Sequence, residues 1–475
     1  MNPYFLGEAE RDDKPMELLG QLSSVVFAGV GGVRVALDAL PLRWAEDLWE
    51  THDGELDAER VSRFFETAPF RHLKFTLNWT CLQDLLIPSL RGPRSPSAVS
   101  AGLLGRWIAV KFDPSPYGQA VSYSSVSDSG TLGFVTIIDL APRHLIRYLN
   151  QFTPLVTHVT PTHPDLQNAI GSLPAPHAMA VLDVGQGSAN VMLSEQGRPI
   201  FYFDAGQGIG RNLRTTPAGL RFCTCTKDKE PVPVMISHWH EDHFAGTKSD
   251  PDLLKCTWIT PPATTARLMS FQNGILAEGS KVLEMESDFL DFSFGSSGSY
   301  TLSKSKGDPN NPNESGHALM VTVGNKHWLL PADASYKNIE LVEDRKFTAV
   351  VATHHGGWSN TTVIPDRAPR YARLVYSFGP DNSHGHPNPS SVDDHRKKWS
   401  HGNWKSPATI GVTTPGPAGR TRATAVNGVS AVPGPTSPHA GSVAIGWKGP
   451  PDVSPGGVLA DPCPTCTKSF HIRQS

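Results

Sequence analysis

The chain has 475 residues, 39% of them hydrophobic and 18% charged, and its 42 basic and 45 acidic side chains leave a formal net charge of -3. At roughly 150 residues per domain, this length predicts two or three structural units with a full-sized buried core. The composition excludes an acidic or basic disordered chain, and the nearly balanced charge gives no overall electrostatic attraction to nucleic acid.

The first 33 residues carry no signal for membrane insertion or export. The longest uncharged stretch, residues 18–33, contains glycines and polar side chains, and it is shorter than the roughly 20 apolar residues that a membrane-spanning helix needs. The N-terminal segment MNPYFLGEAERDDKP is acidic, unlike a secretory signal. We therefore expect a cytoplasmic protein without a membrane span, whose six cysteines are free or metal-bound.

Residues 1–174 contain no recognisable chemical motif. Apolar residues recur at helical spacing in residues 61–65 and 145–152, so we expect an α/β or mostly helical region there, with polar, serine-rich stretches between the helices. Residues 160–176 contain four prolines and are interpreted as a linker. The region has no assigned role, and it could bind substrate or a protein partner.

Residues 175–450 show a different pattern, in which short apolar strands are separated by Gly and Asp turns. This pattern predicts an α/β domain with mixed sheets. Residues 413–440 are rich in Pro, Gly, Ser and Thr and are interpreted as an exposed insertion, and residues 451–475 as a tail containing CPTC. The expected strands are 179–184, 190–193, 200–203, 232–236, 318–323, 328–330, 349–352, 374–378 and 442–447.

The strongest chemical signal is His-Trp-His-Glu-Asp-His at residues 238–243, directly after the strand 232–236. A turn at the end of a strand can point several of these side chains at one spot. Imidazoles with a carboxylate suit a borderline divalent metal such as zinc, or manganese where oxygen ligands dominate. We therefore predict a metal site here.

Three further polar segments follow strands of the same domain. Strand ends on one edge of a sheet converge, and a carboxylate at such an end could bridge two ions. We expect these segments to complete the site. They are Asp333 in LLPAD, His354 and His355 in HHGG, and Asn382, His384 and His386 in NSHGHP.

The order of these motifs, preceded by DVGQG at 183–187 and FDAG at 203–206, resembles the metallo-β-lactamase superfamily. Within that superfamily it is most similar to the soluble nuclease-like domain of the bacterial DNA-uptake proteins called ComEC. The resemblance covers residues 178–448, and the membrane channel of those proteins has no counterpart here. It implies an αββα sandwich and a centre of two divalent ions, Zn²⁺ or Mn²⁺.

The resemblance also implies roles for the motif residues. His238 and His240 would bind the first ion, Asp242 and His243 the second, and Asp333 both. His386 would close the shell of the second ion. His354 or His355 occupies a general-acid position, and either could instead be a ligand. Asp183 and Asp204, with Asn382 and His384, would hold the loops that carry the ligands.

Two departures from the superfamily pattern bear on this ligand set. The hydrolases usually have a further histidine before the bridging aspartate, whereas here residues 310–317 form an Asn-rich turn ending in His317. His317 could complete the first ion's shell or be a bystander. Ala332 stands where a glycine is more usual, which leaves the role of Asp333 unchanged.

Two-metal chemistry of this kind activates water for hydrolysis. In it Asp242 would orient the attacking group, and His354 or His355 would protonate the leaving oxygen. The leading hypothesis is a phosphodiesterase that cleaves nucleic acid or a nucleotide. One alternative is a hydrolase of a small molecule such as a cyclic nucleotide, lactone or thioester. The other is a silent interaction protein with a structural metal centre, against which the complete ligand set argues.

Two weaker signals lie outside the central motifs. Cys223 and Cys225 could form a structural zinc site with Cys463 and Cys466, or the four could be unrelated loop residues. Arg396, Lys397 and Lys398, on a predicted helix at 390–401, could hold a nucleic-acid backbone or form an ordinary solvated helix face.

Overall fold

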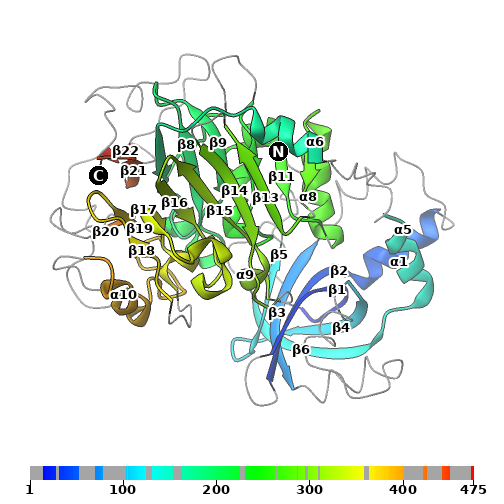
Figure 1. Cartoon of the computed structure of the whole chain (residues 1–475). Helices are drawn as coiled ribbons and strands as arrows, with labels where there is room; N and C mark the ends of the chain where they lie inside the picture. Colours follow the sequence, from blue (N-terminus) through cyan, green and yellow to red (C-terminus); the bar gives the residue numbers. More distant parts are fainter. Residues whose placement is uncertain are drawn as a thin grey trace, which may run out of the picture. The chain divides into compact units, whose positions relative to one another are not determined.

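Two compact units make up the computed structural model of the chain (Figure 1). Unit 1 comprises residues 1–158, 263–278 and 308–311, and unit 2 comprises the rest. No helix among the described residues is long and apolar enough to cross a membrane. The structure describes residues 14–27, 32–52, 70–78, 103, 105–124, 131–152, 163–224, 231–263, 265–285, 287–294, 298–308, 311–357, 363–400, 421–424, 441–449 and 472–474.

Unit 1 is built on a closed antiparallel barrel with the strand order β1-β2-β3-β5-β6-β4. Helices α1 (Leu42–His52), α5 (Arg143–Phe152) and α8 (Ala266–Ala277) belong to the same unit. The strands are β1 (Met16–Phe27), β2 (Gly32–Pro41), β3 (Arg71–Asn78), β4 (Trp107–Pro114), β5 (Ala120–Ser124) and β6 (Thr131–Leu140).

The helix expected at residues 145–152 is confirmed as α5. The described part of the N-terminal region is nevertheless built mainly of strands, so the mostly helical alternative does not hold. Alternate residues of β2, beginning with Val33 and Val35, are buried in the barrel core, as the two-residue period of a strand requires. The helix expected at 61–65 lies outside the described residues.

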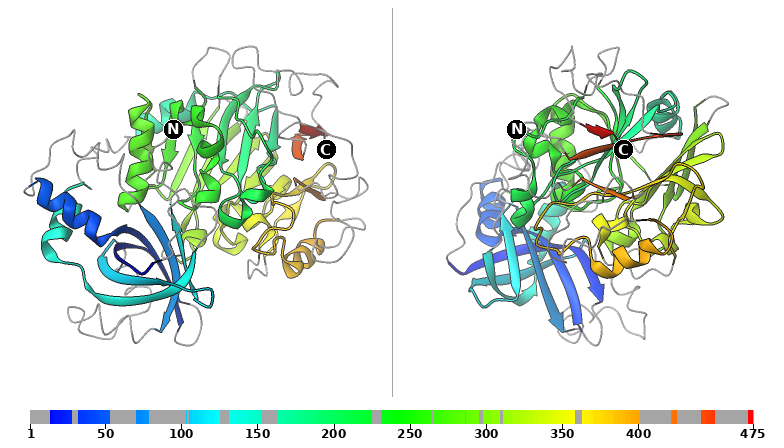
Figure 2. Two further views of the ribbon diagram at one scale, coloured as in Figure 1. Left: turned by 180° about the vertical axis from the view of Figure 1, so that it is seen from behind. Right: turned by 90° about the vertical axis from the view of Figure 1, so that its left-hand side faces the viewer.

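Unit 2 contains two sheets of eight paired strands each, with both parallel and antiparallel pairs (Figure 2). The first sheet has the order β12 (Val282–Glu284), β11 (Trp258–Thr260), β10 (Val234–Met235), β9 (Pro199–Ala205), β8 (Ala189–Leu193), β7 (Ala178–Val181), β21 (Ser442–Gly446) and β22 (Ile472–Gln474).

The second sheet has the order β13 (Phe289–Ser293), β14 (Gly298–Lys304), β15 (His317–Val323), β16 (Lys326–Leu330), β17 (Lys346–Val351), β19 (Arg373–Tyr376) and β20 (Thr421–Ala423), and β18 (Asp366–Arg367) also pairs with β17. The strands that the sequence predicts in this domain are therefore confirmed. Most of the 413–440 insertion and of the tail lies outside the described residues.

The inner faces of the two sheets pack against each other in one apolar core. Leu319 and Val321 of β15 join this core, whereas Ala318 and Met320 of the same strand face a second cluster outside the sheet. Helix α10 (Pro389–Arg396) contributes Val392 to that outer cluster. Layers of this kind, with helical elements outside two packed sheets, confirm the predicted αββα sandwich.

Short helical turns precede or connect the strands of unit 2, and two of these turns lie within residues 160–176. Residues 160–176 are not the plain linker that their prolines suggested, because Leu166 and Ile170 are buried in the core between the sheets. The turns are α6 (His163–Leu166), η2 (Gln167–Gly171), η3 (Gly210–Thr215), η4 (Glu241–His243), α7 (Gly246–Ser249), η5 (Pro251–Lys255), α9 (Pro312–Ser315), η6 (Tyr336–Asn338), η7 (Glu340–Val342) and η8 (Thr353–Gly356).

Asp38 of β2 carries a buried charge that contacts residues at the start of α8 in the same unit. Its carboxylate lies 2.6 Å from Arg267 Nε and 2.8 Å from His72 Nδ1, and it accepts a 2.7 Å hydrogen bond from the hydroxyl of Thr265. Burial by itself raises the pKa of Asp38, but Arg267 and the hydrogen bond from His72 outweigh it, so the pKa is lowered. The carboxylate is therefore ionised at neutral pH.

We expect Asp38→Ala to lower the free energy of unfolding by roughly 3 kcal/mol, because it leaves the buried Arg267 without its counter-charge. Asp113→Ala, which removes the exposed partner of Lys111, should cost under about 1 kcal/mol. Since the folded-state pKa of Asp38 is lowered, its stabilisation should be present above about pH 4 and be lost as the pH falls further. Urea denaturation across this range measures both effects, and equal losses in the two variants would contradict this account.

Candidate metal centre

The HWHEDH segment is held by two glycine turns of the first sheet. The amide of Ser188 donates a 2.9 Å hydrogen bond to the carbonyl oxygen of Asp242. A Cβ atom on Gly206 would overlap that same carbonyl oxygen. The DVGQG and FDAG motifs thus supply the close backbone approach that places residues 238–243 at the end of β10.

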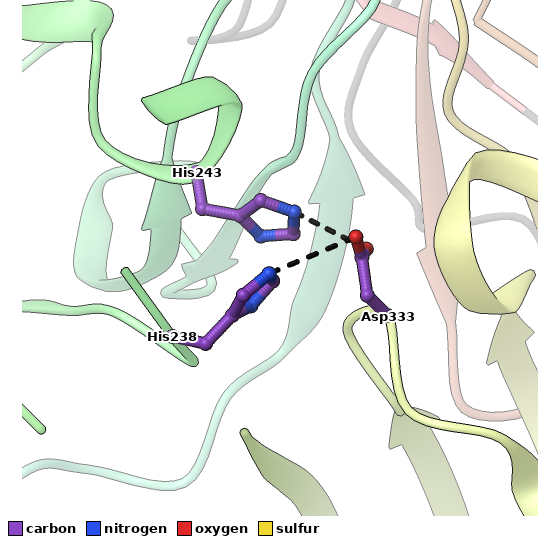
Figure 3. Close-up of side chains that lie close together, drawn as sticks. All are labelled: His238, His243 and Asp333. Carbon is purple, nitrogen blue, oxygen red and sulfur yellow. Dashed lines mark ion pairs between the residues drawn. The ribbon is translucent and has the colours of Figure 1, made fainter. Parts of the chain in front are cut away.

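Two groups of side chains each bring their potential ligand atoms close together. His238, His243 and Asp333 form the first group, and Asp242, His243 and His355 form the second. Within each group the ligand atoms lie within 4.8 Å of one another. Figure 3 shows His238 and His243 pointing at the carboxylate of Asp333 from a different segment of the chain.

The carboxylate of Asp333 faces two pairs of imidazoles. Its Oδ1 lies 3.2 Å from Nε2 of His243 and 3.7 Å from Nε2 of His355. Its Oδ2 lies 3.7 Å from Nε2 of both His238 and His354. One oxygen is therefore directed to each pair of imidazoles.

The distances and the unsatisfied atoms both fit divalent metal. With metal–ligand bonds of about 2.1 Å, neighbouring ligands of a tetrahedral zinc lie about 3.4 Å apart, close to the spacings around Asp333. Nε2 of His238, His243 and His355 and Oδ1 of Asp333 are buried and have no hydrogen-bond partner. Buried polar atoms are rarely left in this state, and bound cations would satisfy them.

Hydrogen bonds at Nδ1 prepare two of the histidines as ligands. Nδ1 of His243 lies 2.8 Å from Asp204 Oδ2, and Asp204 also accepts a 2.8 Å bond from the amide of Ser237. Nδ1 of His355 lies 3.0 Å from the carbonyl oxygen of Ser377. A proton held on Nδ1 leaves the Nε2 lone pair available for a metal.

Charge in the site is balanced within the cluster. Burial and the neighbouring His243 lower the pKa of His238 to about 4. Burial would also lower the pKa of His243, but Asp333 and Asp204 raise it well above its usual value. Burial opposes ionisation of Asp242 and Asp333, yet hydrogen bonds and positive charge from the histidines lower the pKa of both. Ionised carboxylates are the form that binds metal.

His240 and His386 lie beside the two ligand groups and belong to neither. The ring of His240 is 4.7 Å from that of His238, centroid to centroid. Nδ1 of His386 lies 3.1 Å from Nε2 of Gln186. The second group contains His355 at the place where the resemblance implies His386.

His354 and His355 differ in their surroundings. Both have left-handed backbone, with φ of 49° and 56°. The side chain of His355 is 3% exposed and lies 3.3 Å from Asp242 Oδ2, whereas that of His354 is 28% exposed. Nε2 of His354 lies 3.2 Å from Nδ2 of Asn313. His355 thus belongs to one of the two groups of candidate ligands, and the side chain of His354 is the more exposed of the two.

The other residues, which were expected to hold the loops of the candidate ligands, make different kinds of contact. Asp204 contacts the imidazole of His243 directly. The carboxylate of Asp183 accepts a hydrogen bond from Gly185 and so supports the DVGQG turn. Asn382 bonds the amides of His384 and His386 and thereby shapes their loop, in which the His384 side chain is exposed.

His317 is buried at the start of β15 and lies outside both ligand groups. Its amide donates to the carbonyl of Ser237, and its Nε2 lies 3.3 Å from the carbonyl of Ser287. Burial lowers its pKa to about 4. The contacts therefore place His317 in support of the segment that leads to His238.

The basic cluster on α10 is matched by acidic neighbours. The ion pairs are Arg396 with Asp393 at 3.0 Å, Lys397 with Asp394 at 2.6 Å, and Lys398 with Asp366 at 2.9 Å. Each of the three basic residues thus has a carboxylate partner, which weakens the field that the cluster can offer to a phosphate backbone.

Of the four cysteines considered for structural zinc, only Cys223 is described. It is buried, and its carbonyl oxygen accepts a 2.9 Å hydrogen bond from the hydroxyl of Tyr202. Cys225, Cys463 and Cys466 lie outside the described residues, so the zinc site stays a prediction.

Sequence reasoning missed Gln186 and Asn313 as contacts of the site histidines. Both lie inside segments that had been noticed, DVGQG and the Asn-rich turn, but they were interpreted only as turn residues. Neither residue type signals a metal neighbour without the three-dimensional contact.

No protein-family model and no curated protein matches the chain. Similar solved structures include the metallo-beta-lactamase fold protein YhfI from Bacillus subtilis, with 16% identity, TM-score 0.25, and coverage of 37% of this chain and 70% of that one. Zn²⁺-bound PqqB from Methylobacterium extorquens has 14% identity, TM-score 0.26, and coverage of 36% and 71%. An isothiocyanate hydrolase from Delia radicum gut bacteria has 16% identity, TM-score 0.28, and coverage of 45% and 90%.

At such identities and TM-scores these likenesses assign no activity to the chain. None of the three names a ComEC-like protein, so the narrower branch has no support from them. The chemistry of the site rests on its own residues.

We expect the purified protein to bind about two divalent ions per chain, and Asp333→Asn to reduce this number to one or fewer, because Asp333 faces both sides. His317→Gln should retain both ions. Elemental mass spectrometry measures the content. Chelation should lower the unfolding temperature of the wild type more than that of Asp333→Asn, which has fewer ions to lose. Loss of one ion from His317→Gln would show that His317 is a ligand.

Proposed function

We propose that this protein is a metal-dependent hydrolase with a two-ion centre. The observation that carries the proposal is the buried carboxylate of Asp333, whose two oxygens face His243 with His355 on one side and His238 with His354 on the other. Asp242, His243, His355 and Oδ1 of Asp333 would hold one ion. His238 and Oδ2 of Asp333 would hold the other, with His240 adjacent.

Bound divalent ions in such a site supply Lewis acidity, which lowers the pKa of water and neutralises charge on the attacked group. The protein supplies the geometry. Asp204 and the carbonyl of Ser377 fix the rings of His243 and His355. Asp242 also lies 3.3 Å from His355, so it is restrained in one orientation.

His354 is the residue that we assign to proton transfer to the leaving oxygen. His355 is buried, its Nδ1 lies 3.0 Å from the carbonyl oxygen of Ser377, and its Nε2 is one of the candidate ligand atoms. His354 is more exposed, and its Nε2 lies near Asp333 and Asn313. A general acid must reach the leaving group from the solvent side of the centre, and His354 has that position.

Phosphodiesters are the substrate class that we propose first, since two ions neutralise the charge of a phosphoryl group. The motif resemblance to nuclease-like domains supports a nucleic-acid or nucleotide substrate. One observation favours a small molecule instead. The three basic residues of α10, which could have held a polymer backbone, are each paired with a carboxylate.

Asp242→Asn should lower the turnover of bis-p-nitrophenyl phosphate by at least about a hundredfold, because it removes a charged ligand from the buried site. Glu195→Ala, on an exposed turn, is the control and should keep wild-type turnover. The same proteins are then assayed with labelled single-stranded DNA, RNA, a lactone and a thioester. Asp242-dependent cleavage of a polymer supports the nuclease function, and cleavage of only the ester substrates points to a small-molecule hydrolase.

His354→Gln tests the general acid. Loss of a general acid typically costs about 10²–10⁴ in rate. We expect such a loss with a natural phosphodiester, whose alkoxide leaving group needs a proton. The loss with bis-p-nitrophenyl phosphate should be much smaller, because p-nitrophenolate leaves without one. Equal losses on the two substrates, or a lost metal ion in this variant, would show that His354 is a ligand.

A further inference from the structure

His395 of α10 is a fully buried imidazole whose two ring nitrogens both contact tyrosine hydroxyls. Its side chain lies between two buried tyrosines, with Nε2 3.0 Å from the hydroxyl of Tyr336 and Nδ1 2.8 Å from the hydroxyl of Tyr376. Both tyrosine rings stand nearly perpendicular to the imidazole. Each ring nitrogen therefore has a hydroxyl partner in the apolar layer outside the second sheet.

Each tyrosine belongs to a segment that carries a metal-site residue. Tyr336 follows Asp333 by three residues, and its hydroxyl accepts a 3.1 Å hydrogen bond from the amide of Thr353, directly before His354. The hydroxyl of Thr353 donates a 2.6 Å bond back to the carbonyl of Ala334. The loop of Asp333 is thus tied to the loop of His354 and His355.

Tyr376 reaches the same loop from the other side. The next residue, Ser377, presents the carbonyl oxygen that lies 3.0 Å from Nδ1 of His355. The side chain of Asn388 caps α10 by accepting a hydrogen bond from the amide of Ser390. The backbone amide of Asn388 donates a 2.8 Å hydrogen bond to the carbonyl oxygen of Gly356. The helix that carries His395 is therefore connected to the end of the His354–His355 loop.

This loop needs such support because its backbone is strained. His354 and His355 have φ of 49° and 56°, in the left-handed region that residues other than glycine enter only at an energetic cost. A conformation of this kind persists only where its surroundings fix it. The hydrogen bonds through Thr353, Ser377 and Gly356 are the ones that do so here.

We propose that His395 is a positioning residue, which joins Tyr336 and Tyr376 and thereby fixes the loops of Asp333, His354 and His355 relative to one another. The proposal rests on the proposed metal centre. The amide of Thr353 donates to Tyr336, whose own proton is then directed to Nε2 of His395. The imidazole in turn donates from Nδ1 to Tyr376. A single neutral imidazole satisfies both hydroxyls in this order.

His395→Phe removes both ring nitrogens and keeps a planar side chain, whereas His395→Gln retains one donor and one acceptor. Val392→Ala is the matched control, because Val392 is buried on the same helix and makes only apolar contacts in the outer cluster. Tyr376→Phe removes only one hydroxyl. It tests the hydrogen bonds of His395 if the His395→Phe variant fails to fold.

Three measurements distinguish positioning from general stability. They are the affinity for Co²⁺ by competition with a chelator, the absorption spectrum of the Co²⁺-loaded protein, and amide hydrogen exchange of residues 353–357 in the metal-free protein. We expect His395→Phe to weaken Co²⁺ binding about 10- to 100-fold, alter the spectrum and speed up exchange. His395→Gln should recover most of the affinity, and Val392→Ala should lower the unfolding temperature without changing these readouts.

Wild-type affinity and spectrum in both His395→Phe and Tyr376→Phe would overturn the proposal, as would an equal loss of affinity in Val392→Ala. These outcomes leave the metal-dependent hydrolase intact. A wild-type protein that binds no Co²⁺, Zn²⁺ or Mn²⁺ would instead overturn the proposed function, and the positioning role would fall with it.

Discussion

The buried carboxylate of Asp333 is the constraint on which the candidate site depends. A charge removed from water is costly unless it is paired, and here four imidazole nitrogens surround its two oxygens. These partners come from residues 238–243 and 354–355, which follow strands of different sheets. The preceding residue, Ala332, has a left-handed φ of 53°, which turns the chain sharply after β16. Glycine adopts this conformation without strain, which fits the glycine that the motif resemblance implies at this position.

The sandwich brings these segments together because strand ends from both sheets meet at one edge. The amide of His354 donates a 2.9 Å bond to the carbonyl of Ala332, and the hydroxyl of Ser377 donates a 2.9 Å bond to Gly187 of the DVGQG turn. The first bond joins two loops of the second sheet, and the second links that sheet to the first beside the candidate ligands. The apolar core between the sheets fixes the frame, and the short polar contacts at its edge set the spacing of the site to within a few tenths of an ångström.

The sequence predicts much of this arrangement and leaves out the parts that depend on packing. Continuous apolar runs such as residues 317–323 predict strands buried on both faces, and motif order predicts which strand ends converge. The barrel of unit 1 could not be predicted in the same way, because β1 and β2 carry glycines and irregular alternation that resemble loop sequence. Motif order also does not distinguish His355 from His386 as a ligand. The placement of His355 in a group of candidate ligands depends on a left-handed turn and on the carbonyl of Ser377, and residue type predicts neither.

The two sides of Asp333 differ in their access to solvent, and this difference divides the chemistry. Asp242, His243 and His355 form one of the two groups of candidate ligands and are largely buried, whereas His354, His384 and His386 are more exposed. Burial and the neighbouring His354 and His355 lower the pKa of His386 to about 3, so its imidazole is neutral at pH 7. A neutral ring offers hydrogen bonds without charge. In the proposed function, His386 would therefore offer a substrate a hydrogen bond, and the ions would neutralise the substrate's negative charge.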